Sequence, residues 1–148
     1  MKAFKFRLQT VLDMRRREEE ARSRELAAAL NALVEENARL TELRILEADA
    51  LAEYHRLQQA GPLDVQAIQW FQTYSVGIGL AIREQLQRVA EAERHAEACR
   101  AALLDAARAK EVLDQLKDKA LEAYRQAEDH AEAKALDEMA TQRHARKS

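Results

Sequence analysis

The sequence predicts an all-α protein in which two long helices form an antiparallel coiled-coil hairpin, the second helix being the longer. Two features of the composition point there. Of the 148 residues, 34 % are charged and 5 % are aromatic, and the chain has only three glycines and one proline. A chain rich in alanine, leucine, glutamate, lysine and arginine with so few helix breakers is typical of long helices. β-Sandwiches, barrels and α/β enzymes need frequent turns and β-branched runs, so this composition argues against them.

The third observation is the position of the one strong break. Ala60-Gly61-Pro62 ends a helix, because glycine tolerates the left-handed geometry of a helix end and proline cannot continue the hydrogen-bond ladder. Asp64 follows as a candidate N-cap. The chain is therefore expected to be a single coiled-coil hairpin over residues 1–148, with a helix over about 3–59, a turn over 60–64 and a helix over about 65–143.

Both helices carry a heptad repeat of apolar residues, which predicts that they pair along their length. Polar residues interrupt both seams. A short connector makes the helices antiparallel neighbours, so that Leu26 lies opposite Cys99 and Leu12 opposite Leu113, and the part after about residue 121 has no partner. The first seam is Leu12, Glu19, Leu26, Leu33, Leu40, Glu47 and Tyr54; Ser75, Gln85, Lys110 and Lys117 interrupt the second.

Charge and hydropathy exclude several classes of protein. The formal net charge is −2, so no field over the whole chain attracts nucleic acid, and we expect no nucleic-acid partner. The lone cysteine, Cys99, cannot form an internal disulfide. Residues 65–82 carry no charge, but glutamines interrupt them and their apolar end is far shorter than the roughly 20 residues of a membrane span, so no integral membrane segment is expected.

No motif indicates catalysis, a cofactor or a metal. Gly77 and Gly79 resemble part of a phosphate loop, but neither a preceding strand nor a lysine completes the motif. His95 and Cys99 are four residues apart and share a helical face, yet a tetrahedral site needs further ligands. No nucleophile, base and orienting group form a set. We therefore expect no catalytic, cofactor-binding or metal-binding residues, and not an enzyme.

Charges and aromatic residues are concentrated at particular places. Residues 1–24 contain eight basic and four acidic side chains, a pattern that suits an acidic or phosphate-bearing partner but is also common on solvated helices. Four of the seven aromatic residues lie near the predicted turn: Tyr54, Trp70, Phe71 and Tyr74. They either close the hairpin core or act as interface anchors.

The opening Phe4-Lys5-Phe6-Arg7-Leu8, continuing through Leu12 to Glu18-Glu19-Glu20, resembles the start of FliJ proteins of the bacterial flagellar type III export apparatus. Residues 113–125 and 136–140 resemble the C-terminal helix of that family. The resemblance implies a coiled-coil stalk associated with an ATPase and similar to the stalk of the rotary ATPase γ subunit. Gly77 and Gly79 depart from the family pattern.

The resemblance also implies partners, a location and site residues. The terminal end would engage the export ATPase FliI hexamer, and the tip would bind the export gate FlhA; export chaperones would be further partners. The protein would be a monomer in the cytoplasm, peripheral at the cytoplasmic face of the inner membrane at the flagellar base, and would serve motility and chemotaxis. The ATPase-facing residues would be Phe4, Phe6, Arg7 and Leu8, and the gate-binding residues Tyr54, Tyr74, Ile78 and Ala81.

Two alternatives remain open from the sequence. One is a generic coiled-coil scaffold whose long helices pair between chains, which light scattering distinguishes from a monomeric hairpin. The other is the equivalent stalk of a virulence type III secretion system.

Overall fold

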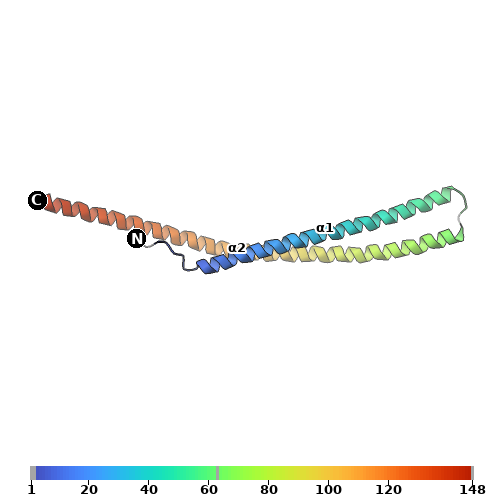
Figure 1. Ribbon diagram of the computed structural model, residues 1–148, viewed down its shortest axis with the longest axis horizontal. Coiled ribbons are helices and arrows are strands. Elements are labelled where there is room, and N and C mark those ends of the chain that lie inside the picture. The colour runs from blue at the N-terminus through green and yellow to red at the C-terminus, as the bar shows by residue number, and fades with distance from the viewer. Residues whose placement is uncertain (1–2, 63, 148) are drawn as a thin grey trace. The chain divides into compact units, whose positions relative to one another are not determined.

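The computed structural model describes residues 3–62 and 64–147 and contains two helices there, with no strand. Helix α1 spans Gln9–Gln59 and α2 spans Val65–Lys147 (Figure 1). The helices run antiparallel, because Tyr54 near the end of α1 packs on Phe71 near the start of α2. The predicted all-α hairpin with the longer second helix is confirmed. Helix α2 continues to Lys147, beyond the expected end at about residue 143.

The turn between the helices has the local geometry that its residues require. Gly61 has a φ of +145°, in a region that side chains other than glycine rarely adopt. The amide of Ala60 still donates to the carbonyl of Arg56 at 3.2 Å. The Asp64 carboxylate accepts from the amide of Gln66 at 3.2 Å, which is an N-cap contact for α2. Leu63, within the predicted turn, lies outside the residues that the structure describes.

The first helix begins at Gln9 rather than at about residue 3. Residues 3–8 alternate between exposed and half-buried: Phe4, Phe6 and Leu8 are half-buried, whereas Lys5 and Arg7 are exposed. Residues 3–6 have no regular secondary structure, and residues 7–8 form a turn that leads into the helix. The helix starts where the amide of Gln9 donates to the carbonyl of Phe6 at 3.1 Å and that of Leu12 to the carbonyl of Leu8 at 2.9 Å.

Packing divides the chain into two compact units. We call Met1–Ala21 with Leu104–Ser148 the terminal unit and Arg22–Leu103 the turn unit. In the turn unit the small buried residues Ala29, Ala96 and Cys99 form a cluster against which Leu26 packs. The expected contact region of Leu26 and Cys99 is thus confirmed, and small side chains there allow close approach of the two helices. In the terminal unit Leu12 is fully buried, and Ala106 is buried on α2.

Some of the polar residues that interrupt the seams are paired across the helices. In the turn unit, Nε2 of Gln85 donates to the carbonyl oxygen of Glu36 at 2.9 Å and to the carboxylate of the same residue. In the terminal unit, Nζ of Lys110 lies 3.2 Å from Oε2 of Glu19, with both side chains about one-quarter exposed. Gln85 with Glu36 and Lys110 with Glu19 are therefore complementary pairs, which the two separate heptad patterns did not reveal.

In the terminal unit the paired region extends beyond residue 121, where the sequence placed its end. The Phe4 ring lies 5.5 Å from the Tyr124 ring, measured between centroids. In this unit Glu19 already pairs with Lys110 and Arg16 with Asp114, which lie about four or five residues further along α2 than the expected alignment of Leu12 with Leu113 places them, so the start of the chain also meets a later part of α2. After the half-buried Glu128, residues 129–147 are all exposed.

Candidate functional site

Neither a metal centre nor a membrane span is indicated in the part of the chain that the structure describes. No three side chains among its histidines, cysteines, aspartates and glutamates gather closely enough to hold a metal ion. Neither of its helices has a stretch apolar and long enough to cross a bilayer. Cys99 is buried, and its Sγ lies 3.7 Å from Nε2 of His95, so these two side chains contact each other within the turn unit. The candidate sites described next are exposed surfaces of the two units.

The first candidate is the terminal surface, formed by residues 3–8 and the part of α2 beside them. Phe4, Lys5, Phe6, Gln9 and Lys117 line a hollow of about 400 Å³ there. Of the four sequence-predicted ATPase-facing residues, Phe4 and Phe6 line this hollow, whereas Arg7 and Leu8 do not. The alternation that half-buries Phe4, Phe6 and Leu8 leaves Lys5 and Arg7 directed to solvent. The segment therefore offers apolar contact and positive charge together.

The charges of the terminal unit are partly neutralised. Arg16 pairs with Asp114 across the helices at 3.4 Å, and Arg15 pairs with Glu18 at 3.1 Å. Within residues 3–62 and 64–147 no ion pair holds Lys5 or Arg7. The positive charge of Lys5 and Arg7 is therefore available to an acidic partner.

Tyr124 of α2 packs against the non-helical start of the chain, residues 3–8. Its ring contacts Phe4, and its hydroxyl donates to Oε1 of Glu128 at 2.8 Å. This hydrogen bond is the main cause that raises the pKa of Tyr124 above its ordinary value, and burial and the negative charge of Glu128 add to it. The tyrosine is therefore neutral at physiological pH and keeps its donor role.

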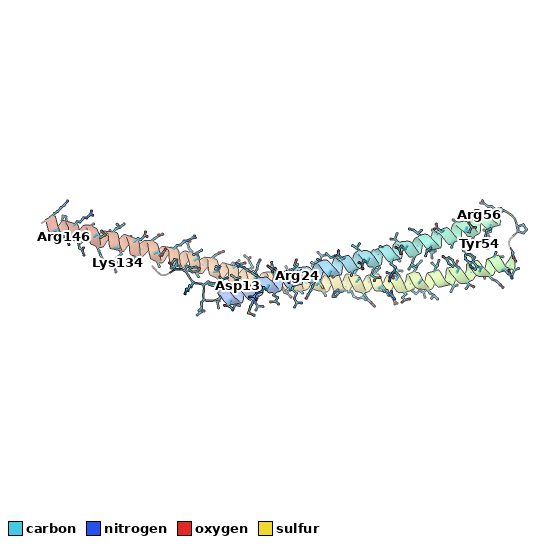
Figure 2. All side chains as sticks on the ribbon, in the orientation of Figure 1. Asp13, Arg24, Tyr54, Arg56, Lys134 and Arg146 are labelled. Carbon is cyan, nitrogen blue, oxygen red and sulfur yellow. The ribbon has the colours of Figure 1, made fainter. Side chains whose placement is uncertain are left out.

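The last part of α2 presents a second exposed apolar feature of the terminal unit. Leu136 and Met139 are both exposed, and with Ala140, Arg143, His144 and Lys147 they line a hollow of about 470 Å³. Figure 2 shows the basic side chains of Lys134 and Arg146 on this part of α2. Apolar and basic side chains thus occur together on an exposed part of α2.

The second candidate, which we call the tip surface, consists of Trp70, Tyr74, Gly77 and Ala81 on α2. These residues recur at intervals of four, three and four, which places them on one side of the helix. Trp70 and Tyr74 stack with their centroids 5.1 Å apart and their planes 10° apart. The Trp70 side chain is 60 % exposed, which makes it the most accessible ring near the turn.

A different aromatic pair closes the core beside the turn. Tyr54 and Phe71 stack at 4.1 Å with an angle of 17° between their planes, and both are half-buried. Figure 2 shows Tyr54 in the last turns of α1. Of the two interpretations of the aromatic residues, the core interpretation therefore fits Tyr54 and Phe71, and the anchor interpretation fits Trp70.

The sequence-predicted gate-binding residues also divide into a group on the tip surface and a group that packs between the helices. Tyr74 and Ala81 belong to the tip surface, whereas Ile78 is 7 % exposed and packs in the seam. Tyr54 offers only part of its ring. The gate-binding set implied by the family resemblance left Trp70 out, although the sequence analysis named Trp70 among the candidate interface anchors and its spacing of four residues from Tyr74 places both on one side of a helix.

The tip surface is electrically neutral. Residues 65–82 contain no charged side chain. Near the end of α1, Arg56 (labelled in Figure 2) forms an ion pair with Glu53, and their hydrogen bond is the main cause that lowers the pKa of Glu53. The two charges of that pair offset each other, so the tip surface offers a partner aromatic and apolar contact.

The comparisons with known proteins gave one match. The family model described as the flagellar FliJ protein matches residues 4–148. A search of curated proteins and a search of solved structures found no match.

Proposed function

Since the chain belongs to the FliJ family and is thus a component of the flagellar export apparatus, we propose that it acts as a stalk between the export ATPase and the export gate. In this role it docks on the hexameric ATPase FliI, stimulates it or couples it to the gate FlhA, and contacts export chaperones. The observation that carries the proposal is the presence of two chemically different binding surfaces, one basic and apolar, the other neutral and aromatic.

The terminal surface is the proposed site for the ATPase. Phe4, Phe6 and Leu8 supply apolar contact, and the exposed Arg7 and Lys5 supply positive charge. A socket lined by acidic and apolar side chains complements this combination, and the charge would steer the encounter. Because this segment lies outside the helix, its side chains are presented at a different spacing from those of a helix.

The tip surface is the proposed site for the gate. Trp70 and Tyr74 are of the residue types that dominate binding energies at protein interfaces, and the exposed Trp70 ring has the most area to bury. Tyr54 contributes less to this contact, because its ring already stacks on Phe71. Binding of a gate that is itself in the membrane would hold the chain peripherally at the cytoplasmic face of the inner membrane.

The exposed part of α2 is the proposed contact for export chaperones. Leu136 and Met139 offer an apolar strip flanked by basic residues, which suits a helix-in-groove contact with an acidic rim. Through these contacts the chain would support flagellar assembly, motility and chemotaxis.

The decisive experiment measures hydrolysis of ATP by the cognate FliI hexamer with and without this chain. We expect saturating chain to raise the rate. Removing residues 1–12, or the milder double reversal Lys5→Glu with Arg7→Glu, should abolish most of the increase. Tyr74→Ala is the matched control, which should leave the increase intact and weaken binding to the gate.

Two results would count against this assignment. Equal rates with and without saturating chain would exclude stimulation of the ATPase. If Tyr74→Ala removed the stimulation while the charge reversals spared it, the two surfaces would have been assigned to the wrong partners.

A further inference from the structure

Two lysines interrupt the apolar seam of α2 in the terminal unit, and their surroundings differ. Lys110 pairs with Glu19 of α1 at 3.2 Å. Lys117, one heptad further along, is also half-buried, yet no ion pair holds it within residues 3–62 and 64–147. A lysine that is partly withdrawn from water loses hydration, which only a counter-ion replaces well. Among the described residues, Lys117 thus lacks the counter-ion that Lys110 has.

The carboxylates nearest to Lys117 in the pattern of the two helices are engaged by other groups. Positions three and four residues away are its neighbours on the helix surface, and of these only Asp114 is acidic. Asp114 pairs with Arg16 of α1 at 3.4 Å. On α1, the Asp13 carboxylate accepts from Nε2 of Gln9 at 2.9 Å. A counter-ion for Lys117 is therefore left to a molecule that binds here.

Lys117 lines the hollow of the terminal surface. The other lining residues are Phe4, Lys5, Phe6 and Gln9, and the hollow has a volume of about 400 Å³. This volume lies within the range of small-molecule pockets, so the hollow has room for one side chain. Two of its lining residues are lysines, and none is acidic. The hollow therefore combines positive charge with aromatic side chains.

One wall of the hollow is held in place by contacts within the terminal unit. The ring of Phe4 packs on the ring of Tyr124, with 5.5 Å between the centroids. The Tyr124 hydroxyl in turn donates to Glu128 at 2.8 Å, which restrains the tyrosine ring. A site whose walls are held before the ligand arrives loses less conformational entropy on binding. The contact also restrains the backbone next to Lys5, the following residue.

The ligand that this chemistry favours is a carboxylate. Ammonium groups and carboxylates form charge-assisted hydrogen bonds, and these are stronger where neighbouring groups keep water away. The rings of Phe4 and Phe6 supply such surroundings. An uncharged side chain would leave both ammonium groups unpaired, and a basic one would be repelled. The hollow therefore discriminates in favour of aspartate and glutamate.

We propose that Lys117 and Lys5 bind the carboxylate of one aspartate or glutamate side chain, which enters the hollow when the chain docks on its partner. The proposal rests on the proposed function in one respect, because it takes the export ATPase as the protein that supplies this side chain. Lys117 is thereby a specificity-determining residue of the terminal surface, since it selects an acidic side chain at one defined point.

The first measurement needs no partner. Lys117→Met removes the charge but keeps an unbranched side chain of similar helix propensity. We expect the melting temperature of the full chain, followed by circular dichroism, to rise by about 2 °C or more, because an apolar side chain replaces an unpaired cation in the seam. Lys110→Met is the contrast. It should lower the melting temperature, because it leaves Glu19 unpaired.

The second measurement is isothermal titration calorimetry of the full chain with the cognate FliI hexamer. Lys117→Met should weaken binding by about tenfold or more, the loss expected for a hydrogen bond between charged groups. Lys117→Arg keeps the charge and should stay within about threefold of the wild type. The wild-type affinity should also fall more steeply with salt than that of Lys117→Met.

Lys119→Met is the matched control for binding. Lys119 is an exposed lysine of the same helix and does not line the hollow. Its replacement removes the same charge from α2, so it tests whether net charge alone explains the loss. The affinity should stay within about twofold of the wild type, because a single exposed charge contributes little.

Each contrary outcome has a separate meaning. If the wild-type chain does not bind FliI, the proposed function fails, and the ATPase as the source of the carboxylate fails with it. If the wild-type chain binds and Lys117→Met binds as well as Lys119→Met, docking on the ATPase stands and the carboxylate at Lys117 is wrong. A lower melting temperature for Lys117→Met would overturn the proposal without any partner, because it would give Lys117 a role in the fold.

Discussion

At the scale of single residues, Gln85 is the most informative position in the turn unit. Its side chain is 3 % exposed, yet it donates to both the backbone and the side chain of Glu36. No buried side-chain nitrogen or oxygen lacks a partner in the parts of the chain that the structure describes. A polar pair inside an otherwise apolar seam favours one alignment of the helices, because any slip leaves the buried amide without its acceptors.

Replacing this residue tests its contribution. Gln85→Ala should lower the free energy of unfolding by about 1–3 kcal/mol, since it removes two hydrogen bonds and leaves a small cavity. Urea denaturation followed by circular dichroism measures the change. Gln87→Ala is the control, because Gln87 is exposed on the same helix and its loss should matter by less than about 0.5 kcal/mol. Equal denaturation midpoints for Gln85→Ala and the wild type would contradict the prediction.

At the scale of elements, the three glycines have different roles. Gly61 ends the first helical segment with a positive φ, whereas Gly77 and Gly79 lie inside α2 with open space around them. The first is required by backbone geometry. The other two weaken the helix locally, and they do so beside the exposed rings of the tip surface.

Alanine substitutions separate these roles. Gly77→Ala and Gly79→Ala should each stabilise the chain by about 0.5–1 kcal/mol, because alanine has the higher helix propensity and its methyl group meets no obstacle. Gly61→Ala should destabilise it by about 1 kcal/mol, since its φ is strained for an L side chain. Thermal unfolding followed by circular dichroism gives all three values. A lower melting temperature for Gly79→Ala would contradict the prediction, because it would mean that the added methyl group meets an obstacle.

At the scale of the whole molecule, the apolar seams of α1 and α2 are satisfied within one chain. Leu12, Ala29, Leu40, Ile78 and Val89 are buried without a second copy. The pairs of Glu19 with Lys110 and of Glu36 with Gln85 also close within the chain. A generic scaffold would instead use these seams to join two chains.

Sedimentation equilibrium distinguishes the two cases. We expect a mass close to the 16.9 kDa of a single chain at micromolar concentration, because the intramolecular contacts carry no cost of association. The variant Trp70→Ala should behave identically, since Trp70 lies outside the seam. A stable dimer of 33–34 kDa, twice the chain mass, would favour the scaffold.

The sequence by itself determined the helices, the break between them and the alignment near Leu26 and Cys99. These features depend on local properties, namely helix propensity, the heptad period and the restricted geometry of Gly61 and Pro62. The family also followed from short segments, above all the Phe4 to Leu8 opening, and the match over residues 4–148 confirmed it.

Only the tertiary structure decided which residues leave the regular pattern and which rings face solvent. Residues 3–8 lie outside the helix, and Phe4 packs there on Tyr124, more than a hundred positions away in the chain. Gln85 is buried because Glu36 is there to accept from it, and Tyr54 stacks inward on Phe71 while Trp70 remains exposed. Each of these outcomes is a contact between distant segments, and its free energy exists only once the two helices lie side by side.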